Sequence, residues 1–245
     1  MTMPYHISTP AVIAHKAREI ILECFHEIDD FERAKIAIDK INDLLTSELI
    51  GSYPNDTIIT KESAYTEYSS GSMWLCKPLS CETFYDSGIS ISTFSLGLII
   101  DGKPIFGIVD NPFARQYRAE SGRYAMDTSA KNCEVSKVNI SNGLIVVTND
   151  IKEIVKNTYI SKIPNPIAMC DPIYDSILVA TGKYAGFINE KATNIDVAVA
   201  QIIVEEAGGK VTDLIGNELD YSKSFRGVVM SNDLIHNDLL NIVNG

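Results

Sequence analysis

The sequence predicts an α/β protein of two lobes, an α+β lobe in residues 1–140 and an α/β lobe in residues 141–245. In the first half, two amphipathic helical patterns precede a series of strand and hairpin patterns. In the second half, strand and helix patterns alternate, an order typical of α/β folds. Residues 127–142 are polar and fit a loop between the two halves. We therefore expect one compact unit with a cleft between its lobes.

The first lobe begins with two predicted helices. Thr9 and Pro10 supply a capping residue and a first-turn proline, and an apolar stripe follows to Ile28. The second helix is expected over residues 32–49, because its apolar residues recur at helical spacing. A short strand is expected at residues 57–60.

Strand patterns fill the remainder of the first lobe. The apolar run 73–76 is typical of a buried strand. Apolar residues between Ile89 and Ile99 predict one long strand, and Asp101-Gly102 carries the signal of a tight hairpin. Residues 104–109 are expected to return as the partner strand, with another hairpin around Gly122.

The second lobe alternates between the two kinds of element. Residues 144–148 form a continuous apolar run, suited to a strand covered on both faces. Further strands are expected at residues 184–188, 211–214 and 227–230, and helices at residues 150–159, 174–181, 196–207 and 233–243.

Composition and charge exclude several classes of protein. The net charge of −11 and the lack of a basic run argue against nucleic acid as a partner. No apolar run approaches the roughly 18 residues of a membrane span, and the N-terminal residues lack a signal-peptide pattern. Five scattered cysteines favour reduced thiols, which predicts a cytoplasmic protein without structural zinc.

Several segments resemble the inositol monophosphatase family. Trp74, Pro78 and Leu79 match its motif W-I-x-D-P-[IL]-D-G-T in register. Residues 178–182 (LVATG) resemble a second motif, and residues 195–209, with their EEAGG end, resemble a third. The resemblance covers most of the chain. It implies a layered α/β/α/β/α sandwich and, in the family, phosphatase chemistry on magnesium.

The resemblance also implies where the metal ligands would lie, and most of those positions are changed. The family's metal-binding Glu falls on Lys61, beside Glu62. Its two motif Asp positions are Lys77 and Ser80, whereas a third Asp survives as Asp196. The frame of a metal phosphatase is therefore present without most of its ligands.

The other site positions come from the same resemblance. An upstream Asp of the family matches Asp39, and its substrate-holding segment Gly-Ser/Thr-Ala falls on residues 170–172. The acidic residue that grips a sugar hydroxyl in the family falls near Asn189, with Glu190 adjacent. The residues expected to bind a ligand are Lys61, Glu62, Lys77, Ser80, Cys81, Glu82, Thr83, Asp171, Asn189 and Asp196. Glu82, Lys77 and Asp196 are the candidates for any chemistry, although helix capping competes as the role of Asp171.

A lysine at a metal position changes the electrostatics. Magnesium needs oxygen ligands, and two-metal phosphoryl transfer needs several carboxylates. Two unit charges 4 Å apart interact by about 4 kcal/mol at an effective dielectric near 20, so Lys61 and Lys77 should repel a metal. We expect no metal and no cofactor, with Lys77 facing Asp196. Were that pair buried, loss of one partner would cost about 3–5 kcal/mol.

Three functions remain open. The first is a degenerate family member without magnesium-dependent phosphatase activity, whose cleft binds a small anionic molecule or performs metal-free chemistry. The second is an active magnesium-dependent phosphomonoesterase with displaced ligands, Glu62, Glu82, Asp86 and Asp196. The third is a structural subunit that binds another protein, with a lysine–aspartate salt bridge filling a site that binds nothing. The resemblance also implies a homodimer as one form of partnership.

Overall fold

A computed structural model describes residues 8–28, 31–60, 71–147, 158–169 and 171–245. The helices in these ranges are α1 (Ser8–Glu27), α2 (Arg33–Leu44), α3 (Ile50–Ser52), α4 (Glu82–Asp86), α6 (Pro172–Ala180), α7 (Asn194–Glu206) and α8 (His236–Asn244), with a π-helical segment η1 (Leu45–Leu49) and a 3-10 helix η3 (Thr158–Lys162). The strands are β1 (Thr57–Ile59), β2 (Ser72–Lys77), β3 (Phe94–Ile100), β4 (Lys103–Asp110), β5 (Gln116–Glu120), β6 (Met126–Asp127), β7 (Ile145–Val147), β8 (Pro166–Ile167), β9 (Gly186–Asn189), β10 (Lys210–Thr212) and β11 (Val228–Ser231).

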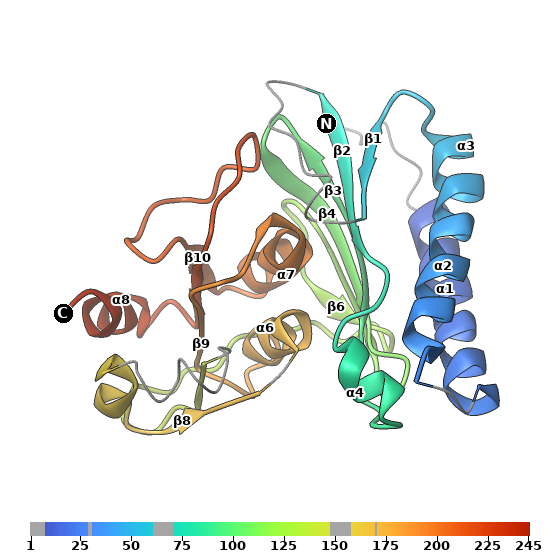
Figure 1. The fold of residues 1–245 in the computed structure, drawn as a ribbon. Coiled ribbons are helices and arrows are strands. Elements are labelled where there is room, and N and C mark those ends of the chain that lie inside the picture. The colour runs from blue at the N-terminus through green and yellow to red at the C-terminus, as the bar shows by residue number, and fades with distance from the viewer. Residues whose placement is uncertain (1–7, 29–30, 61–70, 148–157, 170) are drawn as a thin grey trace.

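These elements stack in five layers. Figure 1 shows α1 and α2 against one face of a six-stranded sheet, with α6 and α7 between that sheet and a five-stranded one. Helix α8 lies on the outer side of the second sheet. The α/β/α/β/α sandwich is therefore confirmed. None of the helices within the described ranges is long and apolar enough to cross a membrane.

The outer helical layer follows the predicted pattern. Helix α1 buries Ile13, Ala17 and Ile21, which recur every four residues along one stripe. Arg18 on the same helix donates Nε to Oδ2 of the buried Asp110 at 2.9 Å, at the end of β4. The helix expected at residues 32–49 is present as α2 continued by η1.

The first sheet has strand order β1-β2-β3-β4-β5-β6, with β1 parallel to β2 and the other neighbours antiparallel. Asp101 and Gly102 have φ of 48° and 77°, the left-handed pair that a tight β3–β4 hairpin requires. The N-terminal half of the long predicted strand is wrong. Ile89 and Ile91 lie outside β3, and residues 82–86, before the predicted strand, form an additional short helix.

The short helix α4 begins where the chain reverses at Cys81. This residue is left-handed, with φ 50° and ψ 44°, and its carbonyl oxygen accepts from the backbone of Phe84 and Tyr85. The buried Tyr85 then donates its hydroxyl to the Ile21 carbonyl of α1 at 2.5 Å. The Ile89 backbone nitrogen donates to the Phe84 carbonyl oxygen at 2.9 Å, so the chain is still turning at this isoleucine.

The second sheet has strand order β10-β11-β9-β7-β8 and mixes parallel and antiparallel pairs. The predicted strands are present with bounds shifted by one or two residues, and β8 is an additional strand that the sequence pattern does not indicate. The helix expected at residues 150–159 lies mostly outside the described residues.

Helix α7 is the central element between the sheets. It packs closely on β3 and β4, where a Cβ at Gly97 would lie 2.9 Å from Val199. A Cβ at Gly107 would lie 2.8 Å from the Val199 carbonyl oxygen, so both strands need glycine there. This close approach fixes the start of α7, and with it Asp196, against the end of β2.

Candidate functional site

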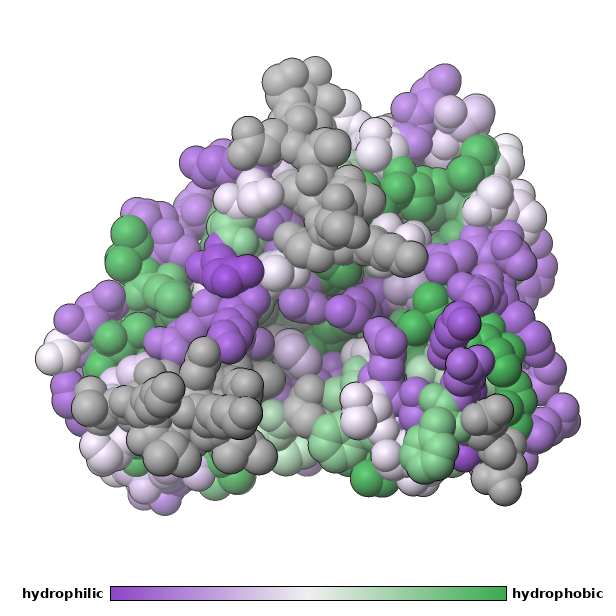
Figure 2. Space-filling model, in the orientation of Figure 1, coloured by the Kyte–Doolittle hydropathy of each residue, from purple (hydrophilic) through white to green (hydrophobic). Residues whose placement is uncertain are grey.

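A cavity of about 480 Å³ opens between α2, the ends of β1 and β2, α4 and the start of α7. Its polar lining consists of Lys35, Asp39, Asn42, Thr60, Lys77, Glu82 and Thr193. Figure 2 shows mostly hydrophilic side chains in the recess between the two halves of the molecule. Because both halves of the chain contribute residues, we call this cavity the cleft.

Lys77 and Asp196 face each other at the cleft. Lys77 Nζ lies 3.4 Å from Asp196 Oδ1, as the sequence predicts, and we call these two residues the cleft ion pair. Lys77 ends β2 on the face of Met73 and Leu75, because side chains alternate along a strand. Its side chain is 35% exposed and that of Asp196 is 21% exposed, so the pair is open to solvent rather than buried.

The second carboxylate oxygen of Asp196 is engaged in the start of α7. Thr193 donates to Oδ2 from its hydroxyl at 3.0 Å and from its backbone nitrogen at 3.3 Å. This is one half of a capping box, in which the third helical residue satisfies the capping residue. Asp196 is therefore held in place by its own helix while it faces Lys77.

Ser80, the other changed metal position, lies away from the cleft. Its hydroxyl donates to Asp171 Oδ2 at 2.5 Å and lies 2.9 Å from the Thr93 hydroxyl. Thr93 also donates to Asp171 Oδ2 at 3.1 Å. All three residues are buried. We call them the hydroxyl–carboxylate junction, since they join the segment before β3 to the start of α6.

Asp171 is the capping residue of α6. Its Oδ1 accepts from the backbone nitrogens of Ile173 and Tyr174 at 3.1 and 3.2 Å, and proline at the first helical position favours this start. Burial raises the pKa of the Asp171 carboxyl, while hydrogen bonds from Ser80 and the helix oppose that rise. The capping role expected from sequence is confirmed.

The remaining expected ligand residues divide by place. Glu82 lines the cleft. Thr83 is exposed on α4 outside the cleft lining, and Cys81 forms the turn before that helix. Asn189 is buried in β9, where its Oδ1 accepts from the Lys191 backbone at 2.9 Å. Lys61 and Glu62 lie outside the described residues.

Asp86, one of the proposed displaced metal ligands, has a different task. Its Oδ1 accepts from the backbone nitrogen of Ala34 at 2.7 Å, at the start of α2. It is not among the residues that line the cleft. This bond ties α4 to α2 and so shapes the cleft without facing it.

Sequence reasoning missed two cleft residues on α2. Lys35 and Asn42 lie four residues before and three residues after Asp39, which was expected near the site. Residues three and four apart share one face of a helix. The position of Asp39 was therefore the signal that could have found both.

Among the described residues, the donor set of the cleft does not fit magnesium. Within the described ranges, no three His, Cys, Asp or Glu side chains gather where they could hold a metal. Both oxygens of Asp196 already accept, one of them from an ammonium group. Asp39 and Glu82, the carboxylates that line the cleft, share it with Lys35 and Lys77. Magnesium needs near-octahedral oxygen ligands, which this arrangement does not offer.

Comparison with known proteins gives one family. Residues 14–244 match the family model of inositol monophosphatases. The fructose-1,6-bisphosphatase/inositol-1-monophosphatase of Thermotoga maritima is 24% identical over 82% of this chain and 78% of its own length. Inositol monophosphatase 2 of Solanum lycopersicum is 29% identical over 94% of this chain and 95% of its own.

Solved structures give the same fold. Inositol monophosphatase II of Staphylococcus aureus has a TM-score of 0.86 at 18% identity, covering 97% of this chain and 95% of that one. A further neighbour has been solved with inositol monophosphate bound, at a TM-score of 0.83, 19% identity and a coverage of 96% and 92%.

Proposed function

Because this chain belongs to the inositol monophosphatase family, we propose that it is a member whose cleft binds a small anionic molecule without magnesium. In this proposal Lys77 supplies the positive charge that a metal supplies in the family. The protein would then lack magnesium-dependent phosphatase activity. The observation that carries the proposal is the cleft ion pair, which lies at two positions that the resemblance assigns to metal ligands.

The hydrogen-bonding capacity of Lys77 supports a ligand role. An ammonium group carries three donors, and Asp196 Oδ1 accounts for one. At 35% exposure, the group can present its other donors to the cleft. A phosphate, sulfate or carboxylate oxygen is the acceptor such a group prefers.

The charged residues that line the cleft narrow the class of ligand that it could bind. Lys35 and Lys77 share the lining with Asp39 and Glu82, so the cleft is mixed in charge rather than basic. Two carboxylates would repel a bare polyanion but would accept hydrogen bonds from hydroxyl groups. We therefore favour an anion that also carries hydroxyls, such as a polyol monophosphate.

The same carboxylates favour the second candidate, an active magnesium-dependent phosphomonoesterase. Asp39 and Glu82 line the same cleft and could each supply carboxylate oxygens. Relatives of this chain carry phosphatase names. Against this candidate stand the engaged oxygens of Asp196 and the ammonium beside them.

Inositol monophosphate tests these functions. We expect it to raise the melting temperature in the presence of chelator, because a ligand at 100 times its Kd stabilises by about 2.7 kcal/mol. Lys77→Ala should lose this shift. Lys40→Ala is the matched control, since Lys40 pairs with Glu23 on the outer face of the helical layer at 2.7 Å.

The other functions give different results in the same experiment. Phosphate release that needs magnesium and stops with chelator would establish the phosphomonoesterase instead. A protein that neither binds nor hydrolyses the probe would fit the structural subunit. The cleft ion pair would then be a salt bridge that occupies a site without a ligand. A thermal shift that Lys77→Ala leaves unchanged would refute the role of Lys77.

A further inference from the structure

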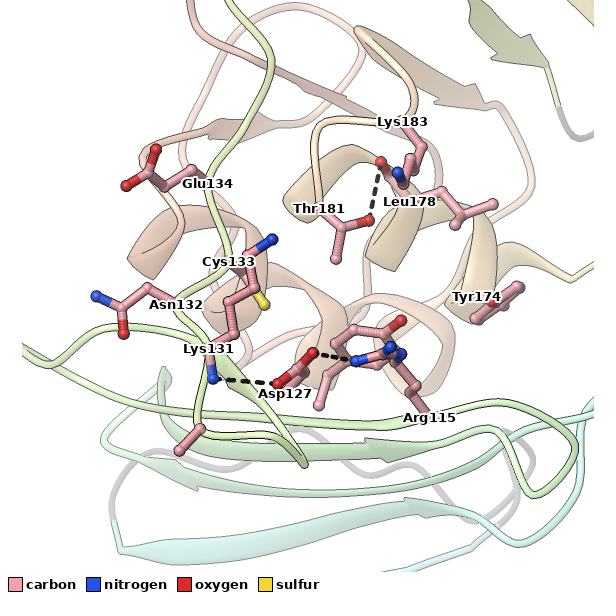
Figure 3. Close-up of a pocket in the computed structure, with 12 residues that line it drawn as sticks. Arg115, Asp127, Lys131, Asn132, Cys133, Glu134, Tyr174, Leu178, Thr181 and Lys183 are labelled. Carbon is pink, nitrogen blue, oxygen red and sulfur yellow. Dashed lines mark hydrogen bonds and ion pairs between the residues drawn. The ribbon is translucent and has the colours of Figure 1, made fainter.

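A second cavity lies outside the cleft, between the β5–β6 hairpin and α6. Its volume is about 820 Å³, within the range of small-molecule sites, and it shares no lining residue with the cleft. Figure 3 shows Arg115, Asp127 and Lys131 on one side of it, and Thr181 and Lys183 on the other. Tyr174 lies at one end and Glu134 at the opposite end.

The polar groups at the base of this cavity are neutral donors. Tyr117 and Cys133 are each only 6% exposed, and both line the cavity with Tyr174. Burial, with smaller effects from Tyr174 and Cys133, raises the pKa of Tyr117 to about 12. Burial likewise raises the pKa of Cys133 to about 11. At neutral pH these groups keep their protons and can donate hydrogen bonds.

The lining charges leave an excess of cations. Arg115, Lys131 and Lys183 are opposed by Asp127 and Glu134, although the chain as a whole carries −11. Asp127 pairs with Arg115 at 2.7 Å and accepts from the backbone of Lys131 at 3.1 Å, so the net positive charge comes from Lys131 and Lys183 against Glu134. What the cavity has left to offer is therefore mainly donors and positive charge.

The walls add an apolar surface. The Tyr174 ring and the Leu178 side chain project from the same face of α6, four residues apart. Aromatic rings prefer to pack against other flat rings, with favourable energy beyond burial alone. A ligand that carries both an aromatic ring and an acidic group matches this combination of apolar and cationic surfaces.

We propose that this second cavity binds a small aromatic anion, with its ring against Tyr174 and Leu178 and its acidic group on Arg115, Lys131 and Lys183. The site is independent of the anion proposed for the cleft. The acidic group is a phosphate or a carboxylate, which have the acceptor oxygens in common.

Phenyl phosphate and benzoate are the probes, each titrated by calorimetry. We expect at least one to bind, and the stronger probe identifies the acidic group. Lys131→Glu combined with Lys183→Glu should raise its Kd by about tenfold or more, equivalent to about 1.4 kcal/mol. Both side chains are exposed, so the fold should tolerate the change. Lys40→Ala, which lines neither cavity, is the matched control and should leave the Kd unchanged.

Several results would overturn the proposal. One is the absence of binding by both probes, and another is a Kd that the double charge reversal does not alter. A third is binding lost in Lys77→Ala alone, which would place the probe in the cleft. A wild-type dimer that the double variant converts to a monomer would assign this cavity to a second copy of the chain.

Discussion

The cleft ion pair and the hydroxyl–carboxylate junction each contain one changed metal position of the family, but their surroundings differ. Ser80 is 3% exposed, and Asp171 beside it accepts four hydrogen bonds, two from hydroxyls and two from the backbone of α6. Lys77 is 35% exposed and has one acceptor, Asp196, among the described residues. The first region is closed and saturated, whereas the second retains donors that face a cavity.

This difference indicates that Ser80 has a structural role and Lys77 a binding role at the positions that the resemblance assigns to metal ligands. A buried polar group must be fully paired, since an unsatisfied one costs about 1–3 kcal/mol. A half-exposed group can leave its donors to water until a ligand displaces that water. The junction should therefore contribute to stability and the pair to binding, and the predictions below test each half of that division.

The largest effect is expected at the junction. Asp171→Ala removes the cap of α6 and leaves the buried hydroxyls of Ser80 and Thr93 without their acceptor. Together these losses should lower the free energy of unfolding by about 3 kcal/mol, measured by urea denaturation. Asp171→Asn is the control, because it keeps one acceptor oxygen and should lose less. Equal and small losses in both variants would contradict the closed character of the junction.

A second buried polar site should respond to pH. The ring nitrogens of His236 lie 2.9 Å from the hydroxyls of Thr212 and Ser231, and burial lowers its pKa to about 4. The unfolded chain, with a pKa near 6.5, binds more protons between pH 6.5 and 4. Stability is therefore lost as the pH falls through that window, by on the order of 3 kcal/mol.

Comparison with a variant isolates the contribution of His236. The pH dependence of unfolding should be flatter in His236→Gln than in the wild type between pH 4 and 6.5. Identical slopes would mean that His236 does not titrate in this window and that its burial has no consequence.

The cleft ion pair should couple weakly. Since both side chains are partly exposed, a double-mutant cycle of Lys77→Met and Asp196→Asn should give about 1 kcal/mol or less. This replaces the 3–5 kcal/mol expected for a buried pair. A larger measured coupling would show that the pair is closed like the junction, and the comparison would fail.

The smallest effect on stability is expected on α2. Lys35→Ala should change the free energy of unfolding by less than about 0.5 kcal/mol, because the residue is exposed. It should nevertheless weaken binding of inositol monophosphate, whereas Lys40→Ala on the same helix should not. If Lys35→Ala binds inositol monophosphate like the wild type, Lys35 on α2 does not contribute to the binding surface.

Periodicity predicted most of the fold because the helices and strands carry regular apolar faces. Helices α1 and α7 were expected from their stripes, and the β3–β4 hairpin from Asp101-Gly102. Helix α4 was missed because its start depends on the left-handed Cys81 and its anchor on a distant carbonyl of α1. Strand β8 is too short to carry a pattern.

The site was only partly predictable. Lys77 and Asp196 were paired in advance because the resemblance assigns both to one metal site. The burial of Ser80 against Asp171 could not be predicted from the sequence, since the two residues are 91 positions apart. Lys35 was overlooked because no motif contains it, and only the approach of α2 to β2 and α4 brings it to the cleft.

Anomalous scattering from manganese-soaked crystals tests most directly whether Lys77 occupies the place of a metal. Peaks at surface carboxylates would show that the ion entered the crystal. We predict that the cleft then shows no peak within about 2.5 Å of Asp196, with the Lys77 ammonium beside it. A strong peak at that distance, with Lys77 turned away, would contradict the account and favour the metal-dependent phosphatase.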